Sequence, residues 1–149
     1  MATDTAAVFG CTGLVGHQIL TTVLSVDHFS NIYTVSRRAP KTGESPKLHA
    51  TVETDTIKWP SELASQSPFP KVVFSALGTN RAQAGGIQNQ WKIDHDLNID
   101  LAKAARAGGA TTFVFVSSGG TRGMLSSFVP YSKMKIGVED AVCHLFLLS

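Results

Sequence analysis

The fold follows from residues 8–16, Val-Phe-Gly-Cys-Thr-Gly-Leu-Val-Gly. Apolar residues at 6–9 predict a short strand, and apolar residues at 15, 19 and 23 predict a helix by their fourfold spacing. Between them, Gly10 permits a tight turn, Gly13 lets backbone amides approach a phosphate, and Gly16 lets the helix pack closely on the strand. A helix that begins at such a turn presents its N-terminus to anions. The stretch therefore predicts a nucleotide-phosphate site.

The glycine spacing, GxxGxxG, is of the kind found in short-chain and extended reductases and differs from the commoner GxGxxG. Glycine-rich turns also form for purely structural reasons, so this motif needs support from elsewhere in the chain. Two further groups of residues give that support, one after the second predicted strand and one in the last predicted helix.

The composition fits one globular domain over residues 1–149, because 43% of the residues are hydrophobic and 16% are charged. A net charge of +2 gives no reason to expect a nucleic-acid partner. The apolar runs fall well short of the roughly 20 residues of a membrane-spanning helix, and the few residues before the first strand leave no room for a signal peptide. We therefore expect a cytoplasmic protein with at most a peripheral membrane association.

The cysteines and histidines predict neither a disulfide framework nor a metal site. Cys11 lies in the glycine loop and Cys143 near the end of the sequence, which indicates a reducing compartment. The five histidines lack the spacing of zinc ligands. His95, between two aspartates, is expected on an exposed helix face.

Strand-like and helix-like patterns alternate along the chain, which predicts βαβ units. Further strands are expected at residues 31–35, 50–53, 71–76 and 111–116, and longer helices around 93–105 and from 130 to at least 142. The prediction is an α/β fold, a doubly wound Rossmann-type parallel sheet of about five strands with helices on both faces. The fifth strand is apolar on both faces, as expected of a strand that helices cover on both sides.

Two predicted helices carry most of the polar residues of interest. In the helix around residues 93–105, apolar residues recur at fourfold spacing and place Asp94 and Asp96 on other faces. The last helix begins at Pro130, and Ser126 or Ser127 is available near its start as a cap.

Tyr131 and Lys135 are four residues apart on the last predicted helix and so share one face. A free tyrosine has a pKa of about 10, so acid or base chemistry near neutral pH requires roughly 4 kcal/mol of phenolate stabilisation. A neighbouring ammonium and a bound nicotinamide cation supply such stabilisation. Ser118, at the end of the fifth strand, has a hydroxyl placed for a substrate carbonyl, with Ser117 as the fallback. The alternative is an exposed helical pair without a chemical role.

Arg37 and Arg38 follow the second strand. In nucleotide folds of this type, an acidic residue here binds the ribose of NAD, whereas an arginine accommodates the 2′-phosphate of NADP. The arginines therefore indicate that NADPH is preferred over NAD, through charge-assisted contacts to phosphate. The alternative is a pair of loop arginines in water.

Four stretches make a resemblance specific: residues 77–86 (LGTNRAQAGG), 92–96 (KIDHD), 113–120 and 131–140. With the glycine loop, they resemble the atypical short-chain dehydrogenase/reductase family, in the group of the HIV-Tat-interacting oxidoreductase and of fungal Fmp-type proteins of the mitochondrial outer membrane. The resemblance runs from about residue 5 to residue 142. It implies a Rossmann fold that binds NAD(P) and a location at the cytosolic face of the mitochondrial outer membrane.

The resemblance also implies roles for individual residues. The pyrophosphate is expected on Gly10, Thr12, Gly13, Leu14, Val15 and Gly16, and the 2′-phosphate on Arg37 and Arg38. The nicotinamide is expected beside Ala76, Leu77 and Gly78. The catalytic trio is Ser118, Tyr131 and Lys135, of which Lys135 also bonds the nicotinamide ribose. For Asn98, a site role and a helix-surface position both stay open.

The sequence departs from the family after the Tyr131 helix. The family continues into a strand that ends in Arg-Pro-Gly and into a segment over the substrate, and neither follows here. Residues 141–149 contain no Gly, Pro or Asn, so either the helix runs on or residues 145–148 form a short extra strand. We expect a truncated product in which the fifth strand becomes a sheet edge and favours self-association.

Two functions follow as hypotheses. The first is an NADPH-binding short-chain-type oxidoreductase, whose complete form reduces an unknown small carbonyl substrate. The second is a non-catalytic NADPH-binding regulator or scaffold, or an inactive truncated product, and the missing substrate segment favours it.

Overall fold

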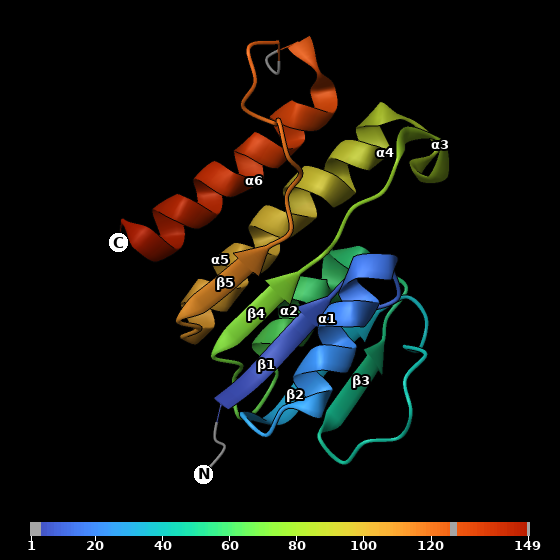
Figure 1. The fold of residues 1–149 in the computed structure, drawn as a ribbon, viewed down its shortest axis with the longest axis vertical. Helices are drawn as coiled ribbons and strands as arrows, with labels where there is room; N and C mark the ends of the chain where they lie inside the picture. Colours follow the sequence, from blue (N-terminus) through green and yellow to red (C-terminus); the bar gives the residue numbers. More distant parts are fainter. Residues whose placement is uncertain (1–3, 126–127, 149) are drawn as a thin grey trace.

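The computed structural model describes residues 4–125 and 128–148. In this part of the chain, five parallel strands form one sheet in the order β3-β2-β1-β4-β5 (Figure 1). The strands are β1 (Asp4–Phe9), β2 (Phe29–Ser36), β3 (Leu48–Val52), β4 (Val72–Ser75) and β5 (Thr112–Phe115). The predicted α/β fold with a parallel sheet is confirmed, and the strand bounds differ from those expected by one or two residues.

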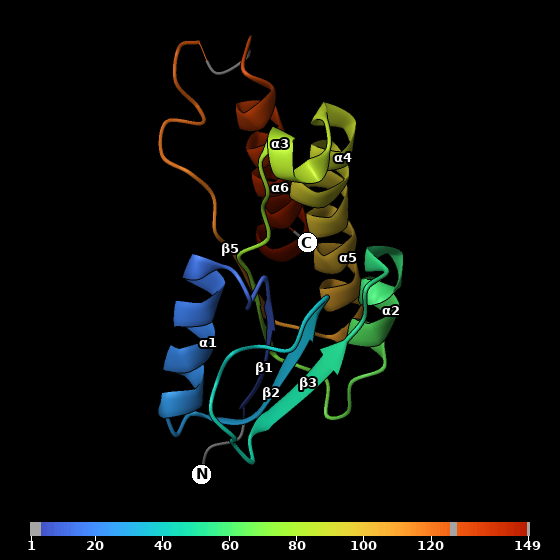
Figure 2. The same ribbon diagram turned by 90° about the vertical axis from the view of Figure 1, so that its right-hand side faces the viewer.

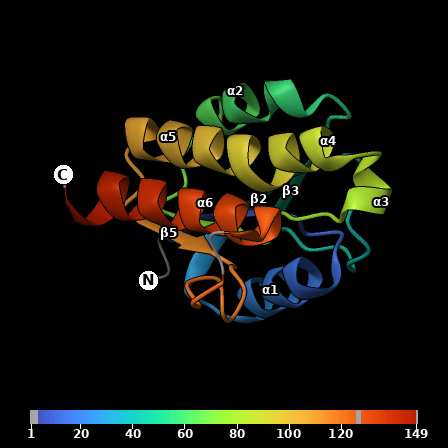
Figure 3. The same cartoon turned by 90° about the horizontal axis from the view of Figure 1, so that it is seen from above.

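Helices cover both faces of the sheet, as predicted. α1 (Leu14–Ser25) lies on one face, and α2 (Trp59–Ala64), α5 (Asn98–Gly108) and α6 (Pro130–Leu147) lie side by side on the other (Figure 2, and from above in Figure 3). Shorter helical segments are η1 (Thr56–Lys58), α3 (Arg81–Ala84), α4 (Ile87–Trp91) and η2 (Lys92–Leu97). Of these, α4 and η2 continue directly into α5. No helix in the described residues is long and apolar enough to span a membrane.

The two faces of the sheet have separate apolar cores. Under α1, Leu20 packs in a cluster with Val8 and Ile32. On the other face, Leu63 of α2 and Leu101 of α5 pack in a cluster with residues of β1, β4 and β5. β1 contributes to both clusters, so residues 5–9 are almost fully buried, as expected of a central parallel strand.

β5 is an edge strand of the described sheet, and one of its faces is open. Phe113 is buried in the cluster under α5, whereas Thr112 is exposed and Val114, on the α1 side, remains 38% exposed. α1 packs on β1 and β2 and does not reach this strand. The prediction of a sheet edge is therefore confirmed, but the prediction that helices cover both faces of the fifth strand is wrong for the described structure.

The last helix, α6, runs on to Leu147. The alternative of a short strand over residues 145–148 is therefore wrong. The helix continues because its final turn has an apolar surface to pack on: the ring centroid of Phe146 lies 5.8 Å from that of Phe113. At the other end, Val129 holds the N-cap position without a side-chain cap, and the expected caps Ser126 and Ser127 lie outside the described residues.

We expect the free edge of β5 to promote self-association, because its unpaired backbone groups can pair with another chain. Val114→Lys places a charge on the open face beside this edge and should reduce association. Size-exclusion chromatography with light scattering measures both effects. Ile57→Lys, at an exposed apolar position away from the sheet edge, is the control. A stable monomer at micromolar concentration for the unchanged chain would contradict the expectation.

Candidate functional site

Gly10 makes the turn that leads from β1 into the site. Its φ of 79° lies in the left-handed region, and a Cβ on this residue would lie 2.6 Å from the carbonyl oxygen of Ala76. Only glycine meets both demands without strain. Gly16, in α1, faces the same loop, where a Cβ would collide with the carbonyl of Gly10. The glycine spacing therefore reflects close backbone packing, as the sequence predicts for these two positions.

A cleft of about 370 Å³ opens at the carboxyl ends of the strands, between the glycine loop, the end of β2 and the loop after β4. Its lining includes most of the predicted cofactor residues: Gly10, Thr12, Gly13, Arg37, Arg38, Ala76, Leu77 and Gly78. α1 begins at the cleft, with Gly13 as N-cap and no acidic residue in its first turn. The positive end of this helix therefore favours an anion in the cleft.

The other predicted phosphate residues surround the start of α1. Leu14 and Val15 are exposed in its first turn, whereas Gly16 is buried beneath the loop. A second cavity of about 450 Å³ adjoins the cleft, and Arg38 lines both. His17 and Lys41 also line this second cavity, so basic side chains gather on this side of the glycine loop.

The helix behind the cleft changes its hydrogen-bond spacing where it passes the loop after β4. η2 is a π-helical segment, and Asn98 is the first residue of α5 after it. Asn98 Nδ2 donates to the carbonyls of Ile93 at 3.3 Å and of Asp94 at 3.2 Å, and its Oδ1 accepts from Ser75 Oγ at 2.5 Å. Asn98 is fully buried, so the helix-surface alternative for this residue is wrong. Segments of this type are frequent at functional sites.

Asp94 lies on the buried side of the same segment and not on a solvated face. Its Oδ1 accepts the backbone N–H of Thr79 at 2.7 Å, and Gln90 Nε2 donates to the carbonyl of Thr79 at 3.1 Å. Burial raises the pKa of Asp94, while the Thr79 amide and the charge of Lys135 act in the opposite direction. The prediction that Asp94 lies on another face than the buried apolar one is wrong, because the row that it forms with Gln90 and Asn98 is buried as well.

His95 also differs from its expected place on an exposed helix face. It is half-buried, with its ring centroid 4.7 Å from that of Trp91, and its Nδ1 lies 2.7 Å from Asp96 Oδ1. A Cβ on Gly137 would lie 2.5 Å from His95 Nε2, so this ring packs between η2 and α6. Packing against α6 and the contact with Asp96 account for its position.

Lys135, on α6, lies beside Gly78, one of the residues that line the cleft. It is 4% exposed, and its Nζ lies 3.5 Å from the position that a Cβ on Gly78 would occupy. Nζ is 5.6 Å from the ring centroid of Tyr131. Burial lowers the pKa of Lys135, and the charges of Asp94 and Glu139 oppose that effect. The structure thus brings Tyr131 and Lys135 together beside the predicted nicotinamide loop, and Lys135 is not part of an exposed pair.

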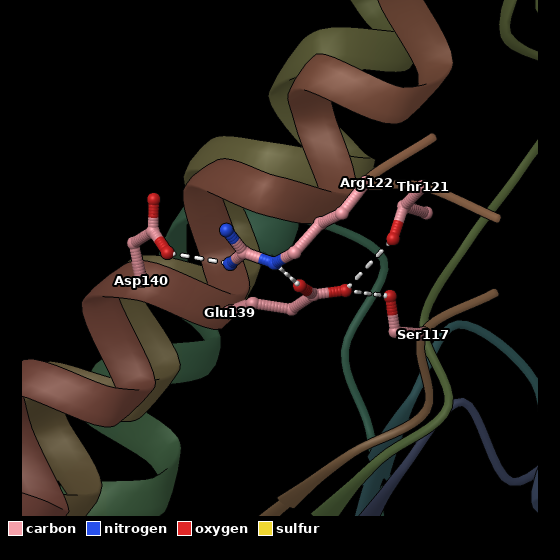
Figure 4. A network of polar contacts seen from close by, with 5 residues as sticks. All are labelled: Ser117, Thr121, Arg122, Glu139 and Asp140. Atoms are coloured by element: carbon pink, nitrogen blue, oxygen red, sulfur yellow. Dashed lines mark hydrogen bonds and ion pairs between the residues drawn. The ribbon is translucent and has the colours of Figure 1, made fainter. Parts of the chain in front are cut away.

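A carboxylate on α6 holds the loop that carries Ser118 (Figure 4). Glu139 accepts hydrogen bonds from Ser117 Oγ at 2.5 Å, Thr121 Oγ1 at 3.3 Å and Arg122 Nε at 3.0 Å, and Arg122 Nη2 donates to Asp140 at 2.6 Å. Ser117, the fallback serine, is therefore engaged in holding the loop. Ser118 is half-buried, and its hydroxyl has no hydrogen-bond partner among the described residues. Of the two serines, Ser118 is the one that remains available to a ligand.

Three polar residues of this site do not follow from motif analysis: Gln90, Asp94 and Glu139. A signal for the first two is present, because Gln90, Asp94 and Asn98 recur at fourfold spacing beside the apolar stripe of the same helix, and all three are buried. Glu139 follows Lys135 by four residues and so lies on the same face of α6.

A family model described as "NAD dependent epimerase/dehydratase family" matches residues 6–137. This chain belongs to that family. The matched region contains the glycine loop, the residues that line the cleft and the helix start with Tyr131 and Lys135. The predicted membership of an NAD(P)-binding, short-chain-type oxidoreductase family is thereby confirmed.

Similar fungal members of the family carry mitochondrial names. This chain is 67% identical over 140 residues to protein fmp52-2, mitochondrial, of Aspergillus terreus, and 56% identical over 150 aligned positions to protein fmp-52, mitochondrial, of Neurospora crassa. These alignments cover 94% and 97% of this chain but 61% and 62% of the two relatives. The chain therefore spans about three fifths of the length of these curated relatives.

Solved structures of NAD-bound enzymes have the same fold. The Bordetella bronchiseptica enzyme WbmF in complex with NAD+ matches with a TM-score of 0.77 at 18% identity, over 97% of this chain and 46% of that one. UDP-glucuronic acid 4-epimerase from Bacillus cereus in complex with NAD matches with a TM-score of 0.72 at 15% identity, over 95% and 52%. At these identities, the likeness shows the fold alone.

Asn98→Ala should lower the free energy of unfolding by about 3 kcal/mol, because it leaves the buried Ser75 hydroxyl without its acceptor and two carbonyls without their donor. Urea unfolding followed by circular dichroism measures the change. Asp100→Ala, at an exposed position on the same helix, is the control. A difference between the two variants below about 0.5 kcal/mol would contradict the buried role of Asn98.

Proposed function

We propose that this family member binds NADPH as one domain over residues 1–149 and that its complete form is an oxidoreductase that reduces a small carbonyl compound. One observation carries the proposal: a single cleft is lined by the glycine loop, by Arg37 and Arg38, and by the loop after β4, with Lys135 beside Gly78. Membership of an NAD-dependent family supports it.

The residues at the cleft fit a dinucleotide. The absence of a side chain on Gly13 lets a pyrophosphate approach the backbone, and the start of α1 offers amide donors without a competing acid. Arg37 and Arg38 supply positive charge next to the end of β2, where this fold places the adenine ribose. This charge supports NADPH as the preferred cofactor.

Tyr131, Ser118 and Lys135 divide the proposed chemistry between them. NADPH, when bound, supplies a hydride for the carbonyl carbon. Tyr131 donates its phenolic proton to the carbonyl oxygen, and Ser118 donates a hydrogen bond that orients the same oxygen. The ammonium of Lys135 stabilises the phenolate that remains after the proton has left.

Arg38→Ala should weaken NADPH binding about tenfold or more and leave NADH binding nearly unchanged, because a charge-assisted contact to the 2′-phosphate is lost. Titration of either dinucleotide into the purified chain, followed by nucleotide fluorescence and thermal shift, measures both affinities. Lys103→Ala, an exposed charge change on α5, is the control. Equal affinity of the unchanged chain for NADPH and NADH would contradict the proposed preference.

Tyr131→Phe should abolish carbonyl-dependent NADPH oxidation and leave NADPH binding nearly intact, because it removes only the proton donor. The loss of NADPH absorbance in the presence of a panel of aldehydes and ketones is the measurement. Tyr33→Phe, which removes a hydroxyl from a buried ring on β2, controls for nonspecific effects. Turnover that survives in Tyr131→Phe would refute the assigned role.

A non-catalytic NADPH-binding regulator or scaffold is the second candidate. Tyr131 is 39% exposed, so the described residues do not enclose its ring. NADPH binding without oxidation against the whole carbonyl panel would support this candidate over the reductase.

We also propose that the protein resides at mitochondria, on the cytosolic face of the outer membrane. The mitochondrial names of its relatives support the organelle, and the face rests on the resemblance alone. Protease treatment of intact isolated mitochondria tests it, because a protein on this face is digested while the organelle is still sealed.

A further inference from the structure

The buried carboxylate of Asp94 is satisfied at only one of its two oxygens. Oδ1 accepts the N–H of Thr79, whereas Oδ2 has no hydrogen-bond partner among the described residues. The residue is fully buried, so solvent does not supply the missing contact. A buried carboxylate of this kind is strongly unfavourable unless an opposite charge lies close to it.

Lys135 provides that opposite charge. Its Nζ and Asp94 Oδ2 lie 3.5 Å and 3.9 Å from one point, the position that a Cβ on Gly78 would occupy. The ammonium also faces two aromatic rings, with their centroids 4.9 Å away in Phe115 and 5.6 Å away in Tyr131. Carboxylate and ammonium therefore both lie beside Gly78 in a largely solvent-free volume, although they are more than 4.0 Å apart and make no direct ion pair.

The charged groups around Lys135 are not equivalent. Asp94 faces it from η2, and Glu139 and Tyr131 face it from α6. Glu139 already accepts hydrogen bonds from the loop between β5 and α6, including one from a guanidinium. His95 of η2 packs against α6 at Gly137, half a turn beyond Lys135. Asp94 is thus the acidic neighbour of Lys135 whose charge has no other cationic partner among the described residues.

We propose that Asp94 is the counterion of Lys135, and that its free Oδ2 keeps the ammonium charged and directed towards the loop after β4. Asp94 is then a positioning residue that acts through Lys135 and does not itself touch the substrate. The effect of Asp94 on catalysis rests on the proposed function. The pairing with Lys135 rests on the position of both side chains beside Gly78. The competing role is purely structural: an anchor for the Thr79 amide through Oδ1.

Asp94→Asn separates these two roles, because the amide keeps an oxygen for the Thr79 N–H but carries no charge. The full chain is labelled with ¹³C at the lysine Cε atoms and titrated by NMR, and the Lys135 signal is assigned with Lys135→Arg. Loss of the negative charge disfavours the protonated amine, so the Lys135 midpoint should move to lower pH by about one unit. Asp100→Asn, on the exposed face of α5, should leave it unchanged.

An unchanged Lys135 midpoint in folded Asp94→Asn would overturn the pairing. Each of the two charges affects the pKa of the other by the same amount. If Asp94→Asn does not fold, a variant of Lys135 therefore tests the same pairing. In Lys135→Met, loss of the ammonium should raise the pKa of Asp94, which ¹³Cγ-labelled aspartate reports. An Asp94 titration that does not move in this variant would equally overturn the proposal.

The proposed function is judged separately. If the unchanged chain binds no NADPH, the proposed function fails, and the lysine titration still decides whether Asp94 and Lys135 are paired. If it oxidises NADPH, the pH profile of the rate should shift in Asp94→Asn to the same side as the Lys135 midpoint. A rate profile that stays in place while the midpoint moves would overturn the positioning role of Asp94.

Discussion

Gly10 leaves β1 with a φ of 79° and passes so close to Ala76 that any side chain would collide with its carbonyl. This approach joins the ends of β1 and β4, the two neighbouring strands from which the sheet extends in opposite directions. Open α/β sheets bind their ligands where the strand order reverses in this way. The connections after the two neighbouring strands lead to opposite sides there and leave a crevice between them. The cleft, the start of α1 and the loop after β4 all take their positions from this one contact.

Buried polar contacts then fix the loop after β4 against the helix behind it. Ser75 bonds to Asn98, Asn98 bonds to the carbonyls of the π-helical segment, and Asp94 holds the amide of Thr79. In a low dielectric, such bonds are strong when complete and costly when one partner is missing. The segment that faces the proposed nicotinamide position is therefore held by directional bonds, which define its geometry more narrowly than apolar packing does.

The parts of the structure that depend on local spacing could be predicted from the sequence. The glycine turn, the alternating strands and helices and the family follow from residues 8–16 and from the motifs near Leu77 and Tyr131. The burial of Asp94 and Asn98 could not be predicted in this way, because polar side chains beside an apolar stripe are ordinarily assigned to solvent, whereas here they pack inward.

Composition was also an incomplete guide to β5. Its apolar residues match a central strand, but the burial of a strand depends on which elements pack over it, and α1 packs mainly over β1 and β2. The assignment of Ser118, Tyr131 and Lys135 to catalysis and the preference for NADPH remain predictions, because each concerns an interaction with a molecule outside the chain.

The contacts of Glu139 affect how the loop between β5 and α6 can vary. This connection runs over residues 116–129, and Glu139 fixes it at Ser117, Thr121 and Arg122. The entropic cost of ordering a loop depends on the length that is left unattached, and these contacts shorten that length considerably. Residues after Arg122 can therefore change in sequence or length without displacing Ser118, so that evolution could vary this part of the loop while the proposed site stays in place.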